Sequence, residues 1–486
     1  MSLLIKGVQV VDGAGRPPYK ADVLIQKNII SAIGNLKRRR ARKEIDGLGN
    51  YLTPGFIDIN TDSDHHLTLF TNPSQSDFTS QGVTTIIGGH CGASLAPLLY
   101  GTLESIRKWV DPTEINVNWH TVGELLKTLD KLPLGINFAT LAGHSTIRRA
   151  LVGESNRHLT QKELAVFQKI LEQSLDEGAY GLSSGLGYVH GRSASDREIR
   201  ALVKVVANLG GVYTTHLRNE TDELLESVKE TLRVAKSTGA KTIISHLRPL
   251  KGFENQFNEA LKLLEKGSAS ASTHFDISPY ATSIQAIYTL LPISLQKGNL
   301  ETMLEEIKDK KMTSLIKREW QGLNFERIKI VDAPHHPYLT GRTIEDADDL
   351  INLMIATGLR ATVLNQNING ELLLGAVTQN RAFIASSSSS PPTGTTLKHE
   401  RVTNTFPKYL EITVKDGQMP IEQAIKKITL DPASYFGVKY RGVIKEKNIA
   451  DLAIIGKSDY EVRSTILGGK VVGEEEARGE VLRRRR

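Results

Sequence analysis

The strongest constraint on the fold is an alternation that begins near Gly55. From there on, short runs rich in β-branched residues alternate with segments long enough to form helices. Such alternation is typical of parallel βα units, in which each helix packs back against the strands that flank it. The strand-like runs number eight and lie at residues 55–60, 83–88, 136–142, 178–183, 211–216, 241–246, 273–277 and 382–386. Eight successive units predict an α/β fold of the (β/α)8 TIM barrel type.

The segments between these runs have the lengths of helices. The clearest helix predictions cover residues 161–177, 220–238 and 257–266. The interval 285–341 is too long for one crossover helix. We therefore predict an inserted subdomain at 285–341, with helices of its own such as one at 300–311.

The two ends of the chain lack this alternation and contain short strand-like runs. The runs lie at residues 3–10, 22–33, 451–455 and 464–472, and a helix is predicted before the last two, at 421–429. Pairing between the terminal strands would form a small β-sandwich beside the barrel. The predicted division is 1–54 for the first part of the sandwich, 55–430 for the barrel with its insertion, and 431–486 for the rest of the sandwich and a basic tail.

The formal net charge is +7, and much of the excess lies in two arginine-rich runs, at 38–42 and 483–486. Neither run contains the aromatic residues that a single-strand-binding surface uses. We interpret both runs as solvated loops or tails, and we expect neither a nucleic acid nor a membrane as partner. No stretch approaches the roughly 18 uncharged apolar residues of a membrane-spanning helix.

The chain contains one cysteine, Cys91, so no disulfide can form within it. This is typical of a protein from a reducing compartment. The first residues read as a strand and lack the features of a secretory signal peptide. We therefore expect a cytoplasmic protein.

Polar side chains of the kinds that bind metals follow the predicted strands. Cys91 follows the second strand, His216 ends the fifth and His246 ends the sixth. His216, His246 and Asp276 follow one another at intervals of 30 residues, which is about the length of one βα unit. Successive units therefore return a polar side chain to the carboxyl end of the barrel, where active sites of this fold lie.

Thiolate and imidazole groups are good ligands for zinc and related ions. Three such ligands leave a fourth position free for water or substrate, as in catalytic zinc sites. The alternative is that Cys91 is a small buried apolar residue and that His216 and His246 are hydrogen-bonded groups of the core. The metal site is favoured because all three residues fall at predicted strand ends.

Several motifs together resemble one enzyme family. Residues 53–58, Thr-Pro-Gly-Phe-Ile-Asp, are similar to the opening barrel strand of the amidohydrolase superfamily, and residues 90–97, His-Cys-Gly-Ala-Ser-Leu-Ala-Pro, resemble a more specific cysteine motif. Further matching motifs begin at Gly143, Gly181, Thr215, Ser245, Ser278, Thr405 and Ala450. In this order, over nearly the whole chain, they resemble the N-acyl-D-amino-acid deacylases, or D-aminoacylases.

The resemblance implies a function and a set of site residues. It implies metal-dependent hydrolysis of the amide bond of N-acyl amino acids, with the D-amino acids expected as substrates. One zinc ion would bind to Cys91, His216 and His246. The substrate carboxylate would be bound by Tyr188, Arg248, Ser283 and Arg401, although Arg248 stands where the family often has lysine, and Arg401 can also be read as a surface charge.

The first departure from the family lies at the end of the first barrel strand. Superfamily members usually have His-x-His there, whereas this chain has Asn60-Thr61-Asp62. The deacylases depend mainly on the other metal position, so the loss is compatible with activity. Asp62 still offers a carboxylate and is a candidate catalytic residue. Nearby Asp64, His65 and His66 are alternatives, and all of them can also be read as a polar loop.

The second departure concerns the general acid/base. The eighth strand of the family ends in Ser-Asp, and Ser387 stands here in the place of that aspartate. A serine hydroxyl does not exchange a proton near neutral pH without a partner. Such proton transfer contributes roughly 10²–10⁴-fold to a rate. We therefore predict weakened activity.

Two alternatives remain open. A non-catalytic relative that binds a metal or an acylated ligand would explain both Ser387 and the missing His-x-His. A cyclic amidohydrolase similar to the dihydroorotases is the other alternative, but those enzymes often use a carboxylated lysine rather than a cysteine motif. In each case the expected partner is a small molecule, and nothing in the sequence indicates an oligomeric state.

Overall fold

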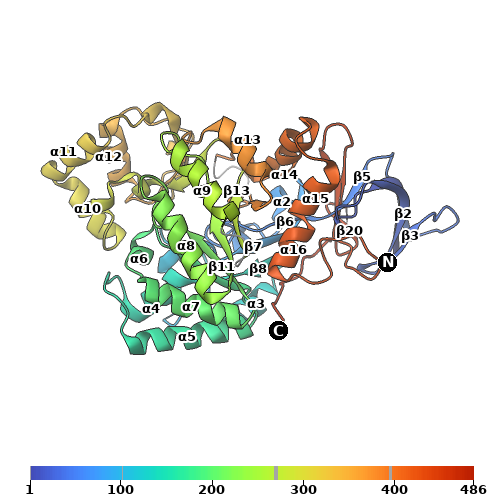
Figure 1. The fold of residues 1–486 in the computed structure, drawn as a ribbon, viewed down its shortest axis with the longest axis horizontal. Helices are drawn as coiled ribbons and strands as arrows, with labels where there is room; N and C mark the ends of the chain where they lie inside the picture. The colour runs from blue at the N-terminus through green and yellow to red at the C-terminus, as the bar shows by residue number, and fades with distance from the viewer. Residues whose placement is uncertain (1, 101, 267–271, 393–396, 475, 486) are drawn as a thin grey trace.

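The structure is a computed structural model that describes residues 2–100, 102–266, 272–392, 397–474 and 476–485. Three regions lie along its long axis (Figure 1). The strands from the chain ends lie at the right of the view, the parallel strands with their helices occupy the centre, and α10 to α12 lie at the left. Within these residues, no helix combines the length and the apolar character needed to cross a membrane.

The centre of the molecule consists of parallel strands. One sheet contains β6 (Phe56–Asp58), β7 (Val83–Gly88) and β8 (Asn137–Thr140). The other contains β9 (Ala142–Gly143), β10 (Gly181–Gly185), β11 (Val212–His216), β12 (Lys241–Ser245), β13 (Thr273–Ile277) and β17 (Ala382–Ile384). Neighbouring strands within each sheet pair in parallel. The strands are short and almost wholly buried, as the β-branched runs predicted.

Backbone hydrogen bonds connect the two sheets at both edges. At one edge, β8 continues into β9, and the N–H of Leu141 between them donates to the carbonyl of Gly88 (3.0 Å). At the other edge, the N–H of Ser387 donates to the carbonyl of Asn60 (3.0 Å), and the N–H of Asp62 donates to the carbonyl of Ser388 (2.8 Å). The chain after β17 therefore lies beside the chain after β6.

The helices between the strands begin and end at recognisable signals. Helix α5 (Gln161–Asp176) begins with a capping box between Thr160 and Glu163. Helix α8 (Leu224–Thr238) starts four residues later than the predicted helix at 220–238, because the side chain of Asn219 accepts hydrogen bonds from the N–H groups of Thr221 and Glu223 and holds a turn there. Helix α9 (Glu254–Lys266) packs beside α8, and α8 packs beside α7 (Asp196–Asn208).

Strands from both ends of the chain form one mixed sheet, which contains parallel and antiparallel pairs. The strands are β1 (Ser2–Val10), β2 (Tyr19–Gln26), β3 (Ile29–Gly34), β4 (Lys43–Asp46), β5 (Tyr51–Pro54), β18 (Leu452–Ile455), β19 (Val462–Leu467) and β20 (Lys470–Val471). β18 pairs with β5, directly before the first parallel strand, so the two termini are joined at that point. β4 and β5 were not predicted from the sequence.

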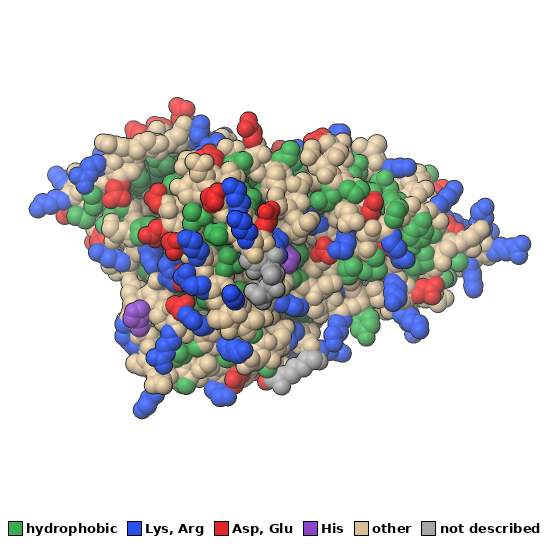
Figure 2. All heavy atoms as spheres, viewed as in Figure 1, with side chains coloured by type: hydrophobic (Ala, Val, Ile, Leu, Met, Phe, Trp, Pro, Cys, Tyr) green, Lys and Arg blue, Asp and Glu red, His purple; other side chains and the backbone are tan. Residues whose placement is uncertain are grey.

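The last residues are packed rather than free. Val481 and Leu482 are buried, and the N–H of Leu482 donates to the carbonyl of Phe138 at 2.7 Å. The side chain of Arg483 is paired with Asp130. The N–H of Arg484 also donates to the carbonyl of Gly178 at 3.0 Å. Within the run 483–486, the interpretation as a solvated tail is therefore wrong for Arg483 and Arg484, which contact other parts of the chain. Over the face drawn in Figure 2, basic and acidic side chains are interspersed.

A second unit with its own apolar core lies between β13 and β17. It contains an antiparallel sheet of β14 (Ser283–Ala286), β16 (Thr362–Asn365) and β15 (Ile328–Asp332), with helices α10 (Leu300–Lys308), α11 (Lys310–Glu319) and α12 (Ala347–Ala356). The helix predicted at 300–311 is interrupted at Asp309, whose side chain caps α11. The apolar core continues to Val363, so this unit extends beyond the predicted 285–341.

Candidate metal centre and substrate cavity

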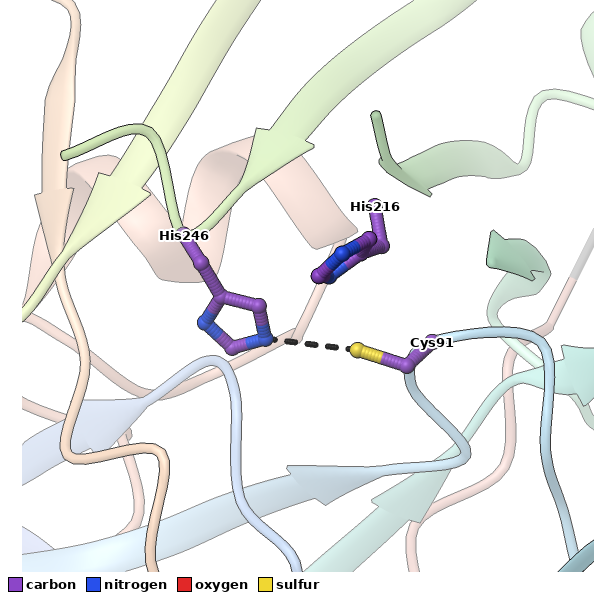
Figure 3. A group of neighbouring side chains, drawn as sticks. All are labelled: Cys91, His216 and His246. Atoms are coloured by element: carbon purple, nitrogen blue, oxygen red, sulfur yellow. Dashed lines mark hydrogen bonds between the residues drawn. The ribbon is translucent and has the colours of Figure 1, made fainter. Parts of the chain in front are cut away.

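Cys91, His216 and His246 come together at the carboxyl ends of the parallel strands (Figure 3). Cys91 lies in the loop after β7, His216 is the last residue of β11, and His246 directly follows β12. One potential ligand atom from each lies within 4.8 Å of the others. Sγ of Cys91 lies 3.3 Å from Nε2 of His246.

The backbone holds two of these residues in an unusual conformation. Cys91 and His246 have φ angles of 53° and 56°, in the left-handed region that non-glycine residues rarely adopt. Such conformations persist where the surrounding structure enforces them, and they are common at functional sites. At the neighbouring Gly92, an added Cβ would lie 2.8 Å from the backbone nitrogen of Gly185. The loop of Cys91 therefore packs tightly against β10, and only glycine fits beside it.

The electrostatics of the three residues suit a cation. Burial raises the pKa of the Cys91 thiol well above its usual value, and the charge of Asp62 adds to this rise. Burial lowers the pKa values of His216 and His246, so both imidazoles are neutral. A buried sulfur and two neutral imidazoles are the donors that zinc and related ions prefer, and a bound cation deprotonates a coordinating thiol. The donor set fits a divalent metal.

The far nitrogen of His246 is held by neighbouring strands. Oγ of Ser387 lies 3.1 Å from its Nδ1, and Oδ1 of Asp276 lies 3.7 Å from the same atom. Asp276 also accepts hydrogen bonds from the backbone N–H of His246 (3.0 Å) and from Nδ2 of Asn60 (3.0 Å). Nε2 is therefore directed toward Cys91 while Nδ1 is fixed from behind, as is usual for histidine ligands.

Glu220 and Tyr188 surround His216. Oε2 of Glu220 lies 3.5 Å from Nε2 of His216 and accepts a hydrogen bond from Arg248 at 2.9 Å. Burial alone would raise the pKa of Glu220, but the charge of Arg248 lowers it. The ring of Tyr188 stacks on His216 with centroids 4.7 Å apart. No role was predicted for Glu220, although its position four residues after His216 was a signal in the sequence.

A cavity of about 320 Å3 opens over the three converging residues. Among the predicted site residues, those that line it are Asp62, Cys91, Tyr188, His216, His246, Arg248, Ser387 and Arg401. Ser283 does not line it, because its buried side chain donates a hydrogen bond to Oδ1 of Asn367 at 2.5 Å. The neighbouring Thr282 and Asn367 face the cavity instead.

Two of the arginines that line this cavity, Arg248 and Arg401, lie near each other. Burial lowers the pKa of Arg401 to about 10, and the charge of Arg248 contributes. One Nη of Arg401 donates to the carbonyl of Thr282 at 2.6 Å, while its buried Nε has no hydrogen-bond partner among the residues that the structure describes. The reading of Arg401 as a surface charge is therefore wrong, since it is 3% exposed. This wall of the cavity is suited to an anion.

Asp62, which also lines the cavity, forms an ion pair with His65. Its Oδ1 lies 3.0 Å from Nδ1 of His65. Burial would raise the pKa of Asp62, but the hydrogen bond and charge of His65 hold it well below its usual range. Burial would lower the pKa of His65, but Asp64 and Asp62 raise it to about 9. Asp64 does not line the cavity and accepts a hydrogen bond from the N–H of Gly89 at 2.7 Å, next to the loop of Cys91.

Comparisons with known proteins show which proteins this chain is similar to. The model of the amidohydrolase family matches residues 379–472. A D-aminoacylase of Alcaligenes xylosoxydans xylosoxydans is 27% identical over 463 residues, covering 93% of this chain and 87% of the relative. An N-acyl-D-aspartate deacylase of the same organism is 27% identical over 474 residues, covering 95% and 87%. The crystal structure of an N-acyl-D-glutamate deacylase from Bordetella bronchiseptica, complexed with zinc and a phosphonate inhibitor, has the same fold (TM-score 0.83, 24% identity, 99% of each chain).

Proposed function

Because this chain belongs to the D-aminoacylase group of the amidohydrolases, hydrolases that act on linear amides, we propose that its substrates are N-acyl-D-amino acids. The observation that carries the proposal is the placement of Cys91, His216 and His246 beside two arginines in one cavity. A candidate metal site and a candidate anion site in the same cavity suit a molecule that has an amide and a carboxylate.

The proposed cofactor is one divalent metal, zinc, bound by Cys91, His216 and His246. When bound, such an ion polarises a carbonyl and lowers the pKa of water. The chain itself orients the ligands, because Ser387 and Asp276 hold Nδ1 of His246 and Tyr188 stacks on His216. The single free cysteine, Cys91, is typical of a protein from a reducing compartment, so a cytoplasmic location is part of the proposal.

Arg248, Arg401 and Tyr188 are proposed to bind the substrate carboxylate. Arg248 pairs with Glu220 through one Nη, and the buried Nε atoms of Arg248 and Arg401 have no hydrogen-bond partner among the described residues. An incoming carboxylate would satisfy these donors and offset the repulsion between the two arginines. Ser283, predicted to contact the carboxylate, is proposed to act through Asn367, which it hydrogen-bonds and which lines the cavity.

Asp62 is proposed to perform the proton transfers that Ser387 cannot. Among the described residues that line the cavity, Asp62 and Glu220 supply the carboxylates, and Glu220 is engaged by Arg248. The pairing with His65 keeps Asp62 ionised but also makes it a weak base. The proposal therefore includes slow catalysis.

The proposed scaffold is a single closed (β/α)8 barrel at 55–430, formed by the two parallel sheets that hydrogen bonds join at both edges. The termini, 1–54 and 431–486, are proposed to form the sandwich. Support comes from the apolar cluster that β1, β2, β5, β18 and β19 share.

A second candidate function is binding without catalysis. The absence of a titratable side chain at Ser387, together with the low pKa of Asp62, favours it. The distinguishing experiment measures metal content of the purified protein and its hydrolysis of N-acetyl-D- and N-acetyl-L-amino acids. Metal with hydrolysis of D-substrates supports the enzyme. Metal without hydrolysis supports the binding protein, and absence of both contradicts the metal site.

A further inference from the structure

A second cavity, of about 300 Å3, adjoins the metal-site cavity, and Tyr188 lines both. Its walls come from the segment around Lys108, from α4 (His144–Val152), from α6 (Val189–Arg192) and from the start of α10 in the inserted unit. The function proposed above assigns no role to this cavity.

Most charges in the second cavity are paired with one another. Arg107 lies 3.4 Å from a carboxylate oxygen of Glu104 and 3.3 Å from one of Glu301. Arg149 donates two hydrogen bonds to Glu154, at 2.7 and 3.2 Å. Each glutamate that lines the cavity therefore already has a cationic partner.

Lys108 is different. Among the described residues, no carboxylate lies within ion-pair distance of its ammonium, which contacts aromatic rings instead. Nζ lies 4.0 Å from the ring centroid of Tyr188 and 5.4 Å from that of Trp109. The rings attract the cation but leave its three N–H donors without acceptors. Burial, together with the charge of Arg149, lowers the pKa of Lys108 to about 8, so the cavity without an anion destabilises the charge.

The ring of Tyr188 connects this cation to the metal site. It contacts Lys108 and also stacks on His216, at 4.7 Å between centroids. A substrate with its carboxylate at Arg248 and Arg401 and its amide beside His216 has two more branches to place, the acyl group and the amino-acid side chain. Because Tyr188 lines both cavities, the second cavity is positioned to accept one of these branches.

We propose that Lys108 binds a second carboxylate on the substrate, carried either by the acyl group or by the side chain of the amino acid. The inference rests on the proposed function. It adds that dicarboxylic substrates are preferred over otherwise equal neutral ones, because an ammonium–carboxylate hydrogen bond is stronger than one to an amide.

The test uses two matched pairs of compounds on the full-length metal-bearing protein. N-succinyl-D-leucine is compared with its succinamoyl analogue, and N-acetyl-D-glutamate with N-acetyl-D-glutamine. We expect kcat/KM to be at least roughly tenfold higher for the acid in one or both pairs, as for one charge-assisted hydrogen bond. In Lys108→Met this ratio should fall to near one, and Lys108→Arg should keep most of it. Lys162→Met, at an exposed position of α5, is the matched control and should keep the wild-type ratio.

The outcomes separate the possible sources of the carboxylate. Preference in the succinyl pair alone assigns it to the acyl group, and preference in the glutamate pair alone assigns it to the side chain. Equal rates within both pairs for the wild type, or an unchanged ratio in Lys108→Met, overturn the inference. If the wild type hydrolyses none of the four compounds, the proposed function fails. The affinity of the protein for each of the four compounds, measured by calorimetry, then decides the role of Lys108. We expect the acid of a pair to bind at least roughly tenfold more tightly than its neutral analogue, and Lys108→Met to remove this difference.

Discussion

Oγ of Ser387 lies 3.1 Å from Nδ1 of His246, on the side of the ring away from the nitrogen that faces Cys91. Ser387 also lines the substrate cavity, and its φ of 47° places it, like His246, in the left-handed region. The residue that the sequence predicts in the place of the family's acid/base therefore lines the cavity, and its hydroxyl contacts the imidazole instead of offering a titratable group.

Replacement of Ser387 by aspartate should raise activity. The carboxylate would face the cavity and supply a proton acceptor and donor, so kcat should rise by at least roughly tenfold, within the usual range of general acid/base catalysis. Its pH profile should gain a limb from a titrating carboxylate. The measurement is the pH dependence of kcat for an N-acetyl-D-amino acid in the two proteins.

Ser386→Asp and Ser388→Asp are the controls for this change. The N–H of Ser386 donates to both carboxylate oxygens of Asp58 at 3.2 Å, so an aspartate there would meet a like charge and destabilise the fold. If Ser387→Asp gains no activity while its metal content stays intact, the missing aspartate does not limit the rate.

The purified protein should contain about one divalent metal per chain. The double variant Cys91→Ser with His216→Ala should lose it, because one imidazole does not hold the ion against water. Elemental analysis checks this, and His120→Ala, at an exposed histidine, is the control. Full metal content in the double variant would show that the ion binds elsewhere.

N-acyl amino acids should be hydrolysed in preference to their carboxamides, because Arg248 and Arg401 face the same cavity. Arg401→Met should raise KM by roughly tenfold or more, since a charged hydrogen bond is lost. In the same variant, kcat/KM for an acyl amino acid should be closer to kcat/KM for its carboxamide than in the wild type. Comparable kcat/KM values for acid and carboxamide in the wild type would contradict the assignment of the anion site.

The ion pair of Asp62 and His65 should make stability depend on pH. The pKa of His65 is raised in the folded protein to about 9, above the ordinary value near 6.5. Its contribution is therefore fully present below about pH 6.5 and is lost as the pH rises through about 9. Melting temperatures of the wild type and His65→Gln should differ more at pH 6 than at pH 9.5. An equal difference at both values would mean that His65 is not charged in the folded protein.

The positions of the strands, and of the three candidate metal ligands at their ends, could largely be predicted from the sequence. Buried parallel strands need β-branched runs, and these recur at the interval of one βα unit, so β7 and β13 were predicted with the bounds that they have. The position of Cys91, His216 and His246 at strand ends followed from the same periodicity. These are local properties, because a strand, its length and its end depend on neighbouring residues.

Only the tertiary structure decided which distant side chains meet. Ser283 hydrogen-bonds Asn367 and does not line the cavity, and Glu220 pairs with Arg248. Lys108 lies against Tyr188, with no carboxylate partner within the described part of the chain. The tertiary structure also paired β14 with β16 across the inserted unit, so that unit extends past its predicted end. Local patterns do not specify such contacts, because a hydrogen bond or ion pair between loops depends on how the strands between them are ordered and on which charges remain unpaired after burial.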